Sequence, residues 1–183
     1  MNRTELIELI IAGKDGEIES LRDKANKLEE LDLADVDVLS FSFKIDDIAD
    51  DKISDLIKEK NLSNQGKWVY VFCADNLSGL LKEFKYTKET EKDKKFSQAN
   101  DVENPNCVYV GSSNDKLKTR MAQHFGKSPV GTYAIRFNEW LPNNEKITCF
   151  CFEVKTPRPD VLQALENGIW DNLRPIIGKR GGK

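Results

Sequence analysis

The sequence predicts an α/β protein in which a small, mainly antiparallel central sheet is flanked by helices and preceded by a helical N-terminal extension. Two patterns support this fold class. After Gly66, short runs rich in β-branched and aromatic residues alternate with segments whose apolar residues recur every three or four positions. Before Gly66, helical spacing dominates. With 39% hydrophobic and 32% charged residues among 183, the chain has enough apolar side chains for a packed core.

The N-terminal extension is predicted to begin with two helices. Thr4 is suited to cap a short helix that ends at Gly13. The helix that follows carries a narrow apolar stripe with 3-4-3 spacing, formed by Ile18, Leu21, Ala25 and Leu28. Such a stripe packs against one neighbour, either within the chain or in a partner subunit. We therefore expect these N-terminal helices to be able to form a homodimer or to bind a partner protein.

The rest of the first region contains one strand and one further helix. Residues 36–43 alternate as a strand does, and residues 46–60 return to helical spacing. Residues 61–66 are rich in turn formers and predict a linker. We therefore place a domain boundary there, with an acidic, mainly helical region at 1–65 and a second domain at 66–183.

The second region is predicted to form the sheet and its flanking helices. The sheet is expected to consist mainly of residues 68–74, 108–112 and 132–137, with 147–154 as another candidate strand. Helices are expected at 116–125 and 160–173, the second of them stopped by Pro175. A long excursion, residues 75–106, separates the first two strands, and its second half is highly charged.

The charge distribution differs between these two regions. Residues 1–65 hold 9 Lys and Arg against 17 Asp and Glu, whereas residues 66–183 hold 19 against 14. A basic second region is suited to a polyanion such as nucleic acid, although ordinary variation in surface charge would give the same counts. The alternating signs between Lys85 and Lys95 favour a solvated insertion over a DNA-binding stripe.

Several protein classes are excluded by the sequence. It has no run of 18 apolar residues, so we expect no membrane association, and it begins without the charged-then-apolar layout of a secretory signal. Four cysteines in a chain of this size do not make a disulfide scaffold, so we expect a reducing, cytoplasmic location. Cys149 and Cys151 share one strand face, but no second pair at zinc spacing accompanies them, which favours buried thiols over a metal site.

Five polar side chains fall at positions suited to chemistry. Tyr70 and Tyr109 lie in two apolar strands, and Arg120 and His124 are four residues apart, hence on one helical face. Glu166 lies inside the last helix, close to its apolar stripe. Each of these residues taken alone is more often structural or simply solvated, so their significance depends on their occurring together.

Taken in order, these residues resemble the GIY-YIG nuclease superfamily over about Gly66 to the C-terminus. The first signature corresponds to Trp68-Val69-Tyr70, which keeps the tyrosine but not the glycine, and the second to Tyr109-Val110-Gly111. The family's arginine helix corresponds to residues 117–125, in which His124 follows Arg120 by one turn as in some restriction-type members. The family's metal-binding glutamate corresponds to Glu166. Because the family usually joins its two tyrosine strands closely, the resemblance implies that residues 75–106 are an insertion.

The resemblance implies a metal-dependent endonuclease that hydrolyses DNA phosphodiester bonds. Glu166 would supply one carboxylate to Mg²⁺ or Mn²⁺, with water and the phosphate completing the shell. Arg120 would neutralise charge that develops on the phosphate. Tyr70 would position or deprotonate the attacking water, its pKa lowered by the nearby cations, while His124 shares the proton transfer. Tyr109 would hydrogen-bond the phosphate or the water.

The resemblance also suggests DNA contacts and a biological role. The basic residues Lys118, Lys179 and Arg180 are candidates for phosphate contacts. The Arg-x3-His spacing favours restriction or defence over excision repair. Cutting both strands of a duplex with one site per chain favours two subunits that act on the two strands.

Two other functions remain open on the sequence. One is a catalytically inactive nucleic-acid-binding module, which is favoured by Gly178 at the position where the family usually carries an asparagine that orders the active site. The other is an interaction protein whose acidic, helical N-terminal region binds a partner.

Overall fold

The computed structural model describes residues 3–31, 37–49, 52–155 and 158–181, and the chain divides into two compact units, Met1–Asp35 and Val36–Lys183. The first unit contains a single helix, α1 (Arg3–Glu29). Two helices separated at Gly13 were expected, but α1 runs through both Gly13 and Gly16 without a positive φ at either. A glycine inside a helix costs about 1 kcal/mol and, unlike proline, removes no hydrogen bond.

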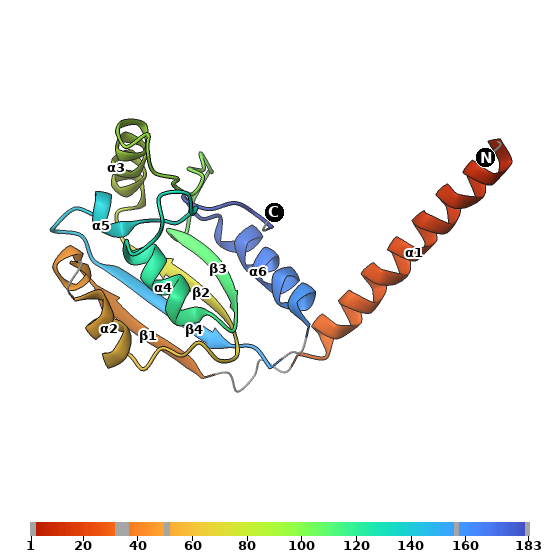
Figure 1. Ribbon diagram of the computed structural model, residues 1–183, viewed down its shortest axis with the longest axis horizontal. Coiled ribbons are helices and arrows are strands. Elements are labelled where there is room, and N and C mark those ends of the chain that lie inside the picture. Colours follow the sequence, from red (N-terminus) through yellow and green to blue (C-terminus); the bar gives the residue numbers. More distant parts are fainter. Residues whose placement is uncertain (1–2, 32–36, 50–51, 156–157, 182–183) are drawn as a thin grey trace. The chain divides into compact units, whose positions relative to one another are not determined.

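The second unit is built on one antiparallel sheet, which confirms the predicted fold class (Figure 1). Its strands lie in the order β1-β4-β2-β3, and their bounds are β1 (Val38–Phe43), β2 (Lys67–Cys73), β3 (Tyr109–Asn114) and β4 (Ile147–Glu153). All three neighbouring pairs are antiparallel. Strand β3 is thus an edge strand, paired only with β2 among the strands described.

The third principal strand was predicted wrongly. Within residues 132–137, only Ala134 forms an isolated bridge, with Phe96. Arg136 has φ +58°, a left-handed conformation that ends any extended strand, and the short helix α5 (Phe137–Trp140) follows directly. Strands β1 and β4 complete the sheet instead, because their alternating apolar residues pair in register with each other, Phe41 opposite Cys149.

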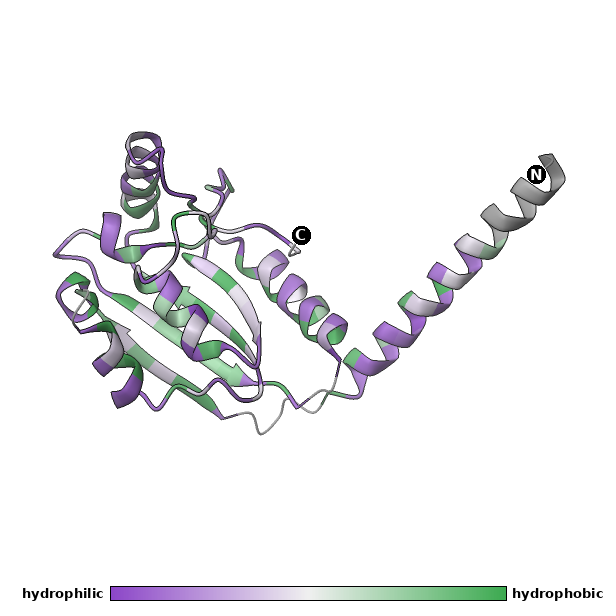
Figure 2. Cartoon of the chain, in the orientation of Figure 1, coloured by the Kyte–Doolittle hydropathy of each residue, from purple (hydrophilic) through white to green (hydrophobic). Residues whose placement is uncertain are grey.

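Helices cover both faces of the sheet, and the strands form the apolar centre of the unit (Figure 2). On one face lie η1 (Ile45–Ile48), α2 (Ile53–Glu59), α4 (Leu117–Phe125) and α5. Aromatic contacts join this layer to the sheet: the ring centroids of Phe43 and Phe125 are 4.9 Å apart, and those of Phe72 and Phe137 are 5.1 Å apart. On the other face, α6 (Pro159–Leu173) packs against β3 and β2.

The long connection between β2 and β3 contains a helix and a segment that joins the end of the chain. Helix α3 (Leu77–Thr90) packs on α5 through Phe84 and Trp140, whose ring centroids are 5.2 Å apart. Farther along, Ala99 bridges Ile177, and the Gly178 amide donates to the Gln98 carbonyl at 2.8 Å. This connection therefore places residues 96–100 beside the chain's last described residues.

The boundary between the two units lies between Asp35 and Val36 rather than after Gln65. Strand β1 pairs with β4, and α2 packs on α4, so both elements belong to the sheet-containing unit. Several of its buried core side chains come from this stretch: Phe41, Phe43, Ile48, Ile53, Leu56, Ile57 and Leu62.

Two further predictions concern membrane-spanning helices and the state of the cysteines. Across the described parts of the chain, no helix combines the length and apolar character that a membrane crossing requires. Cys73, Cys107, Cys149 and Cys151 are all free, and three of them are buried.

Candidate active site at the edge of the sheet

A pocket of about 660 Å³ opens beside the edge strand β3. Three of the predicted site residues line it, each from a different element: Tyr109 from β3, Arg120 from α4 and Glu166 from α6. Its remaining lining residues come from α3, from the connection that follows, and from the chain's end: Lys88, Phe96, Ser97, Gln98, Ser112, Tyr133, Gly178 and Lys179.

The edge position of β3 explains how these groups meet. Tyr109 pairs with Phe72 and Gly111 with Tyr70, so these residues share the face that α4 covers. Ser112 lies on the opposite face, where its hydroxyl donates to Glu166 Oε2 from α6. Since no further strand described here continues the sheet beyond β3, side chains from its two faces reach the same pocket.

Tyr70 and His124 lie behind the pocket wall. Both are fully buried, and Tyr70 Oη is 3.0 Å from His124 Nε2. The backbone N–H of Ile135 donates to His124 Nδ1 at 3.4 Å. A neutral imidazole that accepts at Nδ1 carries its proton on Nε2, so His124 donates to Tyr70 Oη. The Tyr70 hydroxyl proton is consequently free for another partner.

Gly111 allows the two phenols to lie together over β3. The rings of Tyr70 and Tyr109 are stacked, with centroids 6.2 Å apart and an interplanar angle of 19°. A Cβ atom at Gly111 would lie 2.6 Å from Tyr109 Cε1 and 2.7 Å from Tyr70 Oη. The glycine of this signature is therefore required by the close approach of two aromatic side chains.

Burial determines the protonation states of these groups. It raises the pKa of both Tyr70 and Tyr109, and the Arg120 charge opposes this rise without cancelling it. The sequence led us to expect that Arg120 and a bound metal lower the pKa of Tyr70. Arg120 acts in that direction, but in the protein without metal the effect of burial is larger. Burial and the Arg120 charge hold the pKa of His124 well below its usual range, so this imidazole is neutral at neutral pH.

Glu166 is the one predicted metal ligand, and its surroundings suit that role. Its side chain is 8% exposed and lines the pocket. Burial raises the pKa of this carboxyl, while the Ser112 hydrogen bond and the Arg120 charge act in the opposite direction. Among the described residues, no cluster of three or more His, Cys, Asp or Glu could hold a metal ion. A single carboxylate beside a pocket large enough for water fits an ion that keeps most of its hydration shell.

Arg120 is held in place from its own helix. Its Nη1 donates to Gln123 Oε1 at 2.7 Å, one turn farther along α4. Because a guanidinium has five N–H donors, others remain for an anion in the pocket.

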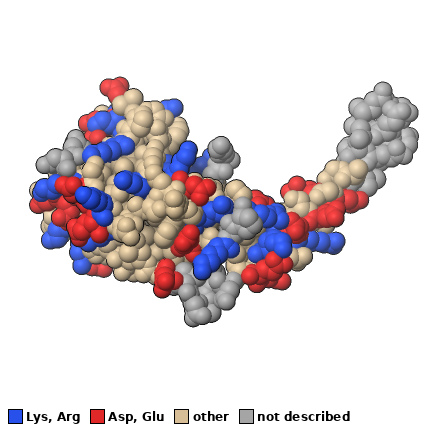
Figure 3. All heavy atoms as spheres, turned by 60° about the horizontal axis from the view of Figure 1, so that its bottom comes forward, with Lys and Arg blue, Asp and Glu red and all other residues tan. Residues whose placement is uncertain are grey.

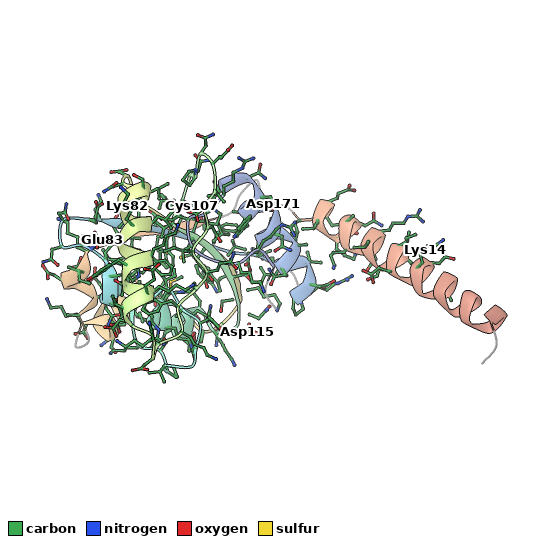
Figure 4. All side chains as sticks on the ribbon, turned by 90° about the horizontal axis from the view of Figure 1, so that it is seen from above. Lys14, Lys82, Glu83, Cys107, Asp115 and Asp171 are labelled. Atoms are coloured by element: carbon green, nitrogen blue, oxygen red, sulfur yellow. The ribbon has the colours of Figure 1, made fainter. Side chains whose placement is uncertain are left out.

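The three basic residues predicted to contact DNA have different surroundings. Lys179 lines the pocket. Arg180 forms a bidentate pair with Asp171, with Nε–Oδ1 at 2.6 Å and Nη2–Oδ2 at 2.8 Å, and Asp171 is labelled on α6 in Figure 4. Lys118 is exposed on α4 but does not line the pocket. On the face drawn in Figure 3, basic and acidic side chains are interspersed.

The backbone of Gly178 lies so close to the Tyr109 ring that a larger side chain would not fit between them. It has φ +112°, and a Cβ atom there would lie 2.8 Å from Tyr109 Cε2. The segment around it is ordered from another part of the chain, because the buried Asn100 side chain donates to the carbonyls of Pro175 at 3.0 Å and of Gly178 at 2.7 Å. An asparagine at position 178 would therefore displace the Tyr109 ring, and Asn100 anchors this backbone instead.

Sequence reasoning missed several residues of the site, among them Lys88, Asn100, Ser112 and Tyr133. Ser112 directly follows the second signature, and this nearness to Tyr109 was the only local signal for it. The other three lie on segments whose approach to the pocket depends on long-range packing. No local pattern could have indicated them.

Residues 68–138 match the family model described as the GIY-YIG catalytic domain. No curated protein and no solved structure matches the chain.

Proposed function

The chain belongs to the GIY-YIG superfamily through residues 68–138, and from this we propose that it is a metal-dependent endonuclease that hydrolyses DNA phosphodiester bonds. The GIY-YIG domain is a nuclease domain. The observation that carries the proposal is the pocket at β3, where a phenol, a guanidinium and a carboxylate from three elements converge.

In this proposal, Glu166 holds Mg²⁺ or Mn²⁺ together with water and the substrate phosphate. When bound, such an ion polarises the phosphate and stabilises the leaving oxygen. Arg120 binds the phosphoryl oxygens through the N–H groups that are not used by Gln123, Tyr70 and Tyr109. Lys179, on the pocket wall, contributes a further phosphate contact.

The two phenols have different roles toward the attacking water. Tyr109 lines the pocket and contacts the water or the phosphate directly, whereas the buried Tyr70 stands behind it. Both phenols act as neutral groups, because burial raises the pKa of each. His124 Nε2–H donates to Tyr70 Oη and so fixes the position of that hydroxyl. His124 therefore acts as a neutral hydrogen-bond donor that positions Tyr70.

The experiment that tests the function is plasmid nicking with Mg²⁺ or Mn²⁺ and an EDTA control. Glu166→Ala is expected to abolish metal-dependent nicking while the circular dichroism spectrum and melting transition stay those of a folded protein. The matched control is Glu83→Ala, an exposed glutamate on α3 that does not line the pocket (Figure 4). Unchanged nicking by Glu166→Ala would remove this carboxylate from the site.

The second candidate is the inactive nucleic-acid-binding module on the same fold. The substitution that favours it, Gly178, is accompanied here by an ordered backbone that Asn100 holds. This supports the catalytic function. Metal-independent DNA binding with no nicking under any divalent ion would favour the inactive module.

We further propose that two chains act together through α1. The stripe on this helix leaves Ile18 39% and Leu21 52% exposed, and a second copy would cover it. Two subunits would place one site on each strand of a target. The Arg120-x3-His124 arrangement supports a restriction or defence role, in which a purified dimer would cut duplex DNA at defined sites.

A further inference from the structure

The pocket has a second wall that the proposed chemistry does not use. Phe96 and Tyr133 form part of it, together with Lys88 from α3. The Tyr133 side chain is 64% exposed, and Lys95 Nζ lies 5.3 Å from its ring centroid. An exposed aromatic ring beside the Lys95 ammonium, in a pocket that Lys88 also lines, combines the two contacts by which proteins hold single-stranded nucleic acid, namely base stacking and phosphate attraction.

This wall is fixed by a buried arginine. Arg136 is 2% exposed, and its guanidinium donates to the carbonyls of Lys95 at 3.2 Å, Ser128 at 3.2 Å and Pro129 at 2.6 Å. Its Nη2 also lies 3.4 Å from the Thr132 carbonyl, directly before Tyr133. These bonds tie together the two loops that carry Tyr133 and Lys95.

A backbone bridge holds the same wall from the other side of Tyr133. Ala134, the next residue, pairs with Phe96, and the Ser97 amide donates to the Ala134 carbonyl at 3.0 Å. The ring is therefore supported before any ligand arrives, so binding loses little conformational freedom.

The dimensions of the pocket favour a nucleotide over a duplex. A volume of about 660 Å³ lies within the range of about 300–1,000 Å³ that is typical of small-ligand pockets. In a duplex, both faces of each base are covered by its neighbours. A base that stacks on a protein ring inside a pocket must therefore be unpaired or extruded from the helix.

We propose that Tyr133 stacks on an unpaired nucleobase next to the phosphate that is cleaved, with Lys88 and Lys95 binding the adjoining phosphates. This inference rests on the proposed nuclease function and narrows its substrate. In a duplex target, the nucleotide next to the cleaved phosphate must then be extruded from the helix, whereas a mismatch or a flap presents it already unpaired.

The test measures DNA binding in EDTA, so that cleavage does not enter the result. A single-stranded oligonucleotide carrying the fluorescent base 2-aminopurine is compared with a blunt duplex of the same sequence. Tyr133→Ala is expected to weaken binding of the single strand by roughly 5- to 150-fold, which is the effect of losing one base–aromatic stack. Tyr133→Phe should keep both the affinity and the fluorescence quenching, and binding of the blunt duplex should change little.

The matched control is Tyr86→Ala, because Tyr86 is 67% exposed on α3 and does not line the pocket. It should bind as the wild type does. Wild-type affinity in Tyr133→Ala, or an equal loss on the blunt duplex, would overturn the stacking role while leaving the nuclease proposal intact. Failure of the wild-type protein to bind any DNA would instead overturn the proposed function.

Discussion

At the scale of single residues, the surroundings of Glu166 disfavour the ionised form of its carboxyl. Burial of Glu166 between its own helix α6 and β3 raises the pKa of its carboxyl. The Ser112 hydroxyl and the Arg120 charge lower this pKa, but by less than burial raises it. A cation in the pocket would remove this conflict, because it would compensate the carboxylate directly. The folded protein without metal therefore keeps a carboxylate that is poorly solvated.

This conflict gives a pH-dependent prediction. A carboxyl whose pKa is raised on folding favours the folded state below its unfolded value of about 4.5, and this contribution is lost as the pH rises through the folded pKa. Glu166→Gln removes the ionisation, so in metal-free buffer the variant should melt at a higher temperature than the wild type at pH 7. The difference should shrink towards pH 4. Thermal melts from pH 4 to pH 8 measure it.

The exposed Glu83→Gln is the control for this comparison, and it should show no such pH-dependent difference. If Glu166→Gln were less stable at pH 7, Ser112 and Arg120 would outweigh the effect of burial.

Gly111 provides a second residue-scale prediction. Gly111→Ala would place a Cβ atom within 2.7 Å of the Tyr70 hydroxyl and closer still to the Tyr109 ring. Overpacking of this kind costs roughly 1–3 kcal/mol, and the displaced phenols should reduce nicking strongly. Chemical denaturation and the plasmid assay measure the two effects.

A matched glycine lies in the interior of α6, where a Cβ at Gly168 would meet nothing within 4 Å. Gly168→Ala should stabilise the protein by roughly 0.5–1 kcal/mol, because alanine favours a helix over glycine. A loss of stability in Gly111→Ala no larger than the change in Gly168→Ala would contradict the crowding described for the two tyrosines.

The site residues could be predicted from the sequence only where they belong to short motifs that follow one another in a recognisable order. From these motifs we expected Tyr109, Arg120 and Glu166 to lie together, and all three line the same pocket. The motifs could not reveal that Tyr70 is sealed behind the wall, nor that Asn100 holds the backbone at Gly178, because both facts depend on contacts between distant segments.

At the scale of elements, the alternation in β1 and the apolar run in β2 predicted these strands correctly. Prediction from the sequence failed at residues 132–137, where an apolar run reads as a strand but Arg136 adopts a left-handed conformation. In that conformation the Arg136 guanidinium donates to backbone carbonyls of Lys95 and Pro129. A local sequence pattern does not reveal such bonds between separate loops. Prediction also failed at Gly13, because a glycine signal for the end of a helix needs a left-handed residue that α1 does not have there.

The stripe on α1 supports a test of assembly. Leu21→Lys should convert a dimer into a monomer in light-scattering measurements, because a charge at the centre of an apolar helix contact must be desolvated. Asn26→Lys adds the same charge to an exposed position outside the stripe and should leave the mass unchanged. A wild-type protein that is monomeric at all concentrations would contradict the role proposed for α1.

At the scale of the whole molecule, the division after Asp35 determines which fragment can fold. A fragment of residues 36–183 keeps the complete sheet and should melt cooperatively. A fragment of residues 66–183 lacks β1, η1 and α2 with their buried aromatic and aliphatic side chains. Each such side chain contributes about 1.5–3 kcal/mol, and several of them outweigh the total stability of about 5–15 kcal/mol that is typical of a domain.

Circular dichroism melts and limited proteolysis of the two fragments distinguish these outcomes. Cooperative melting of 66–183 would show that β1 and α2 are accessory, as the charge distribution along the sequence had suggested.

The edge position of β3 has one further consequence. A strand with a neighbour on one side only opens more easily than the central strands do, and such breathing leaves β2 and β4 paired. Because Tyr109 and Ser112 both lie on this strand, the proposed nuclease activity should be lost on heating below the temperature at which the sheet itself melts, and it should return on cooling.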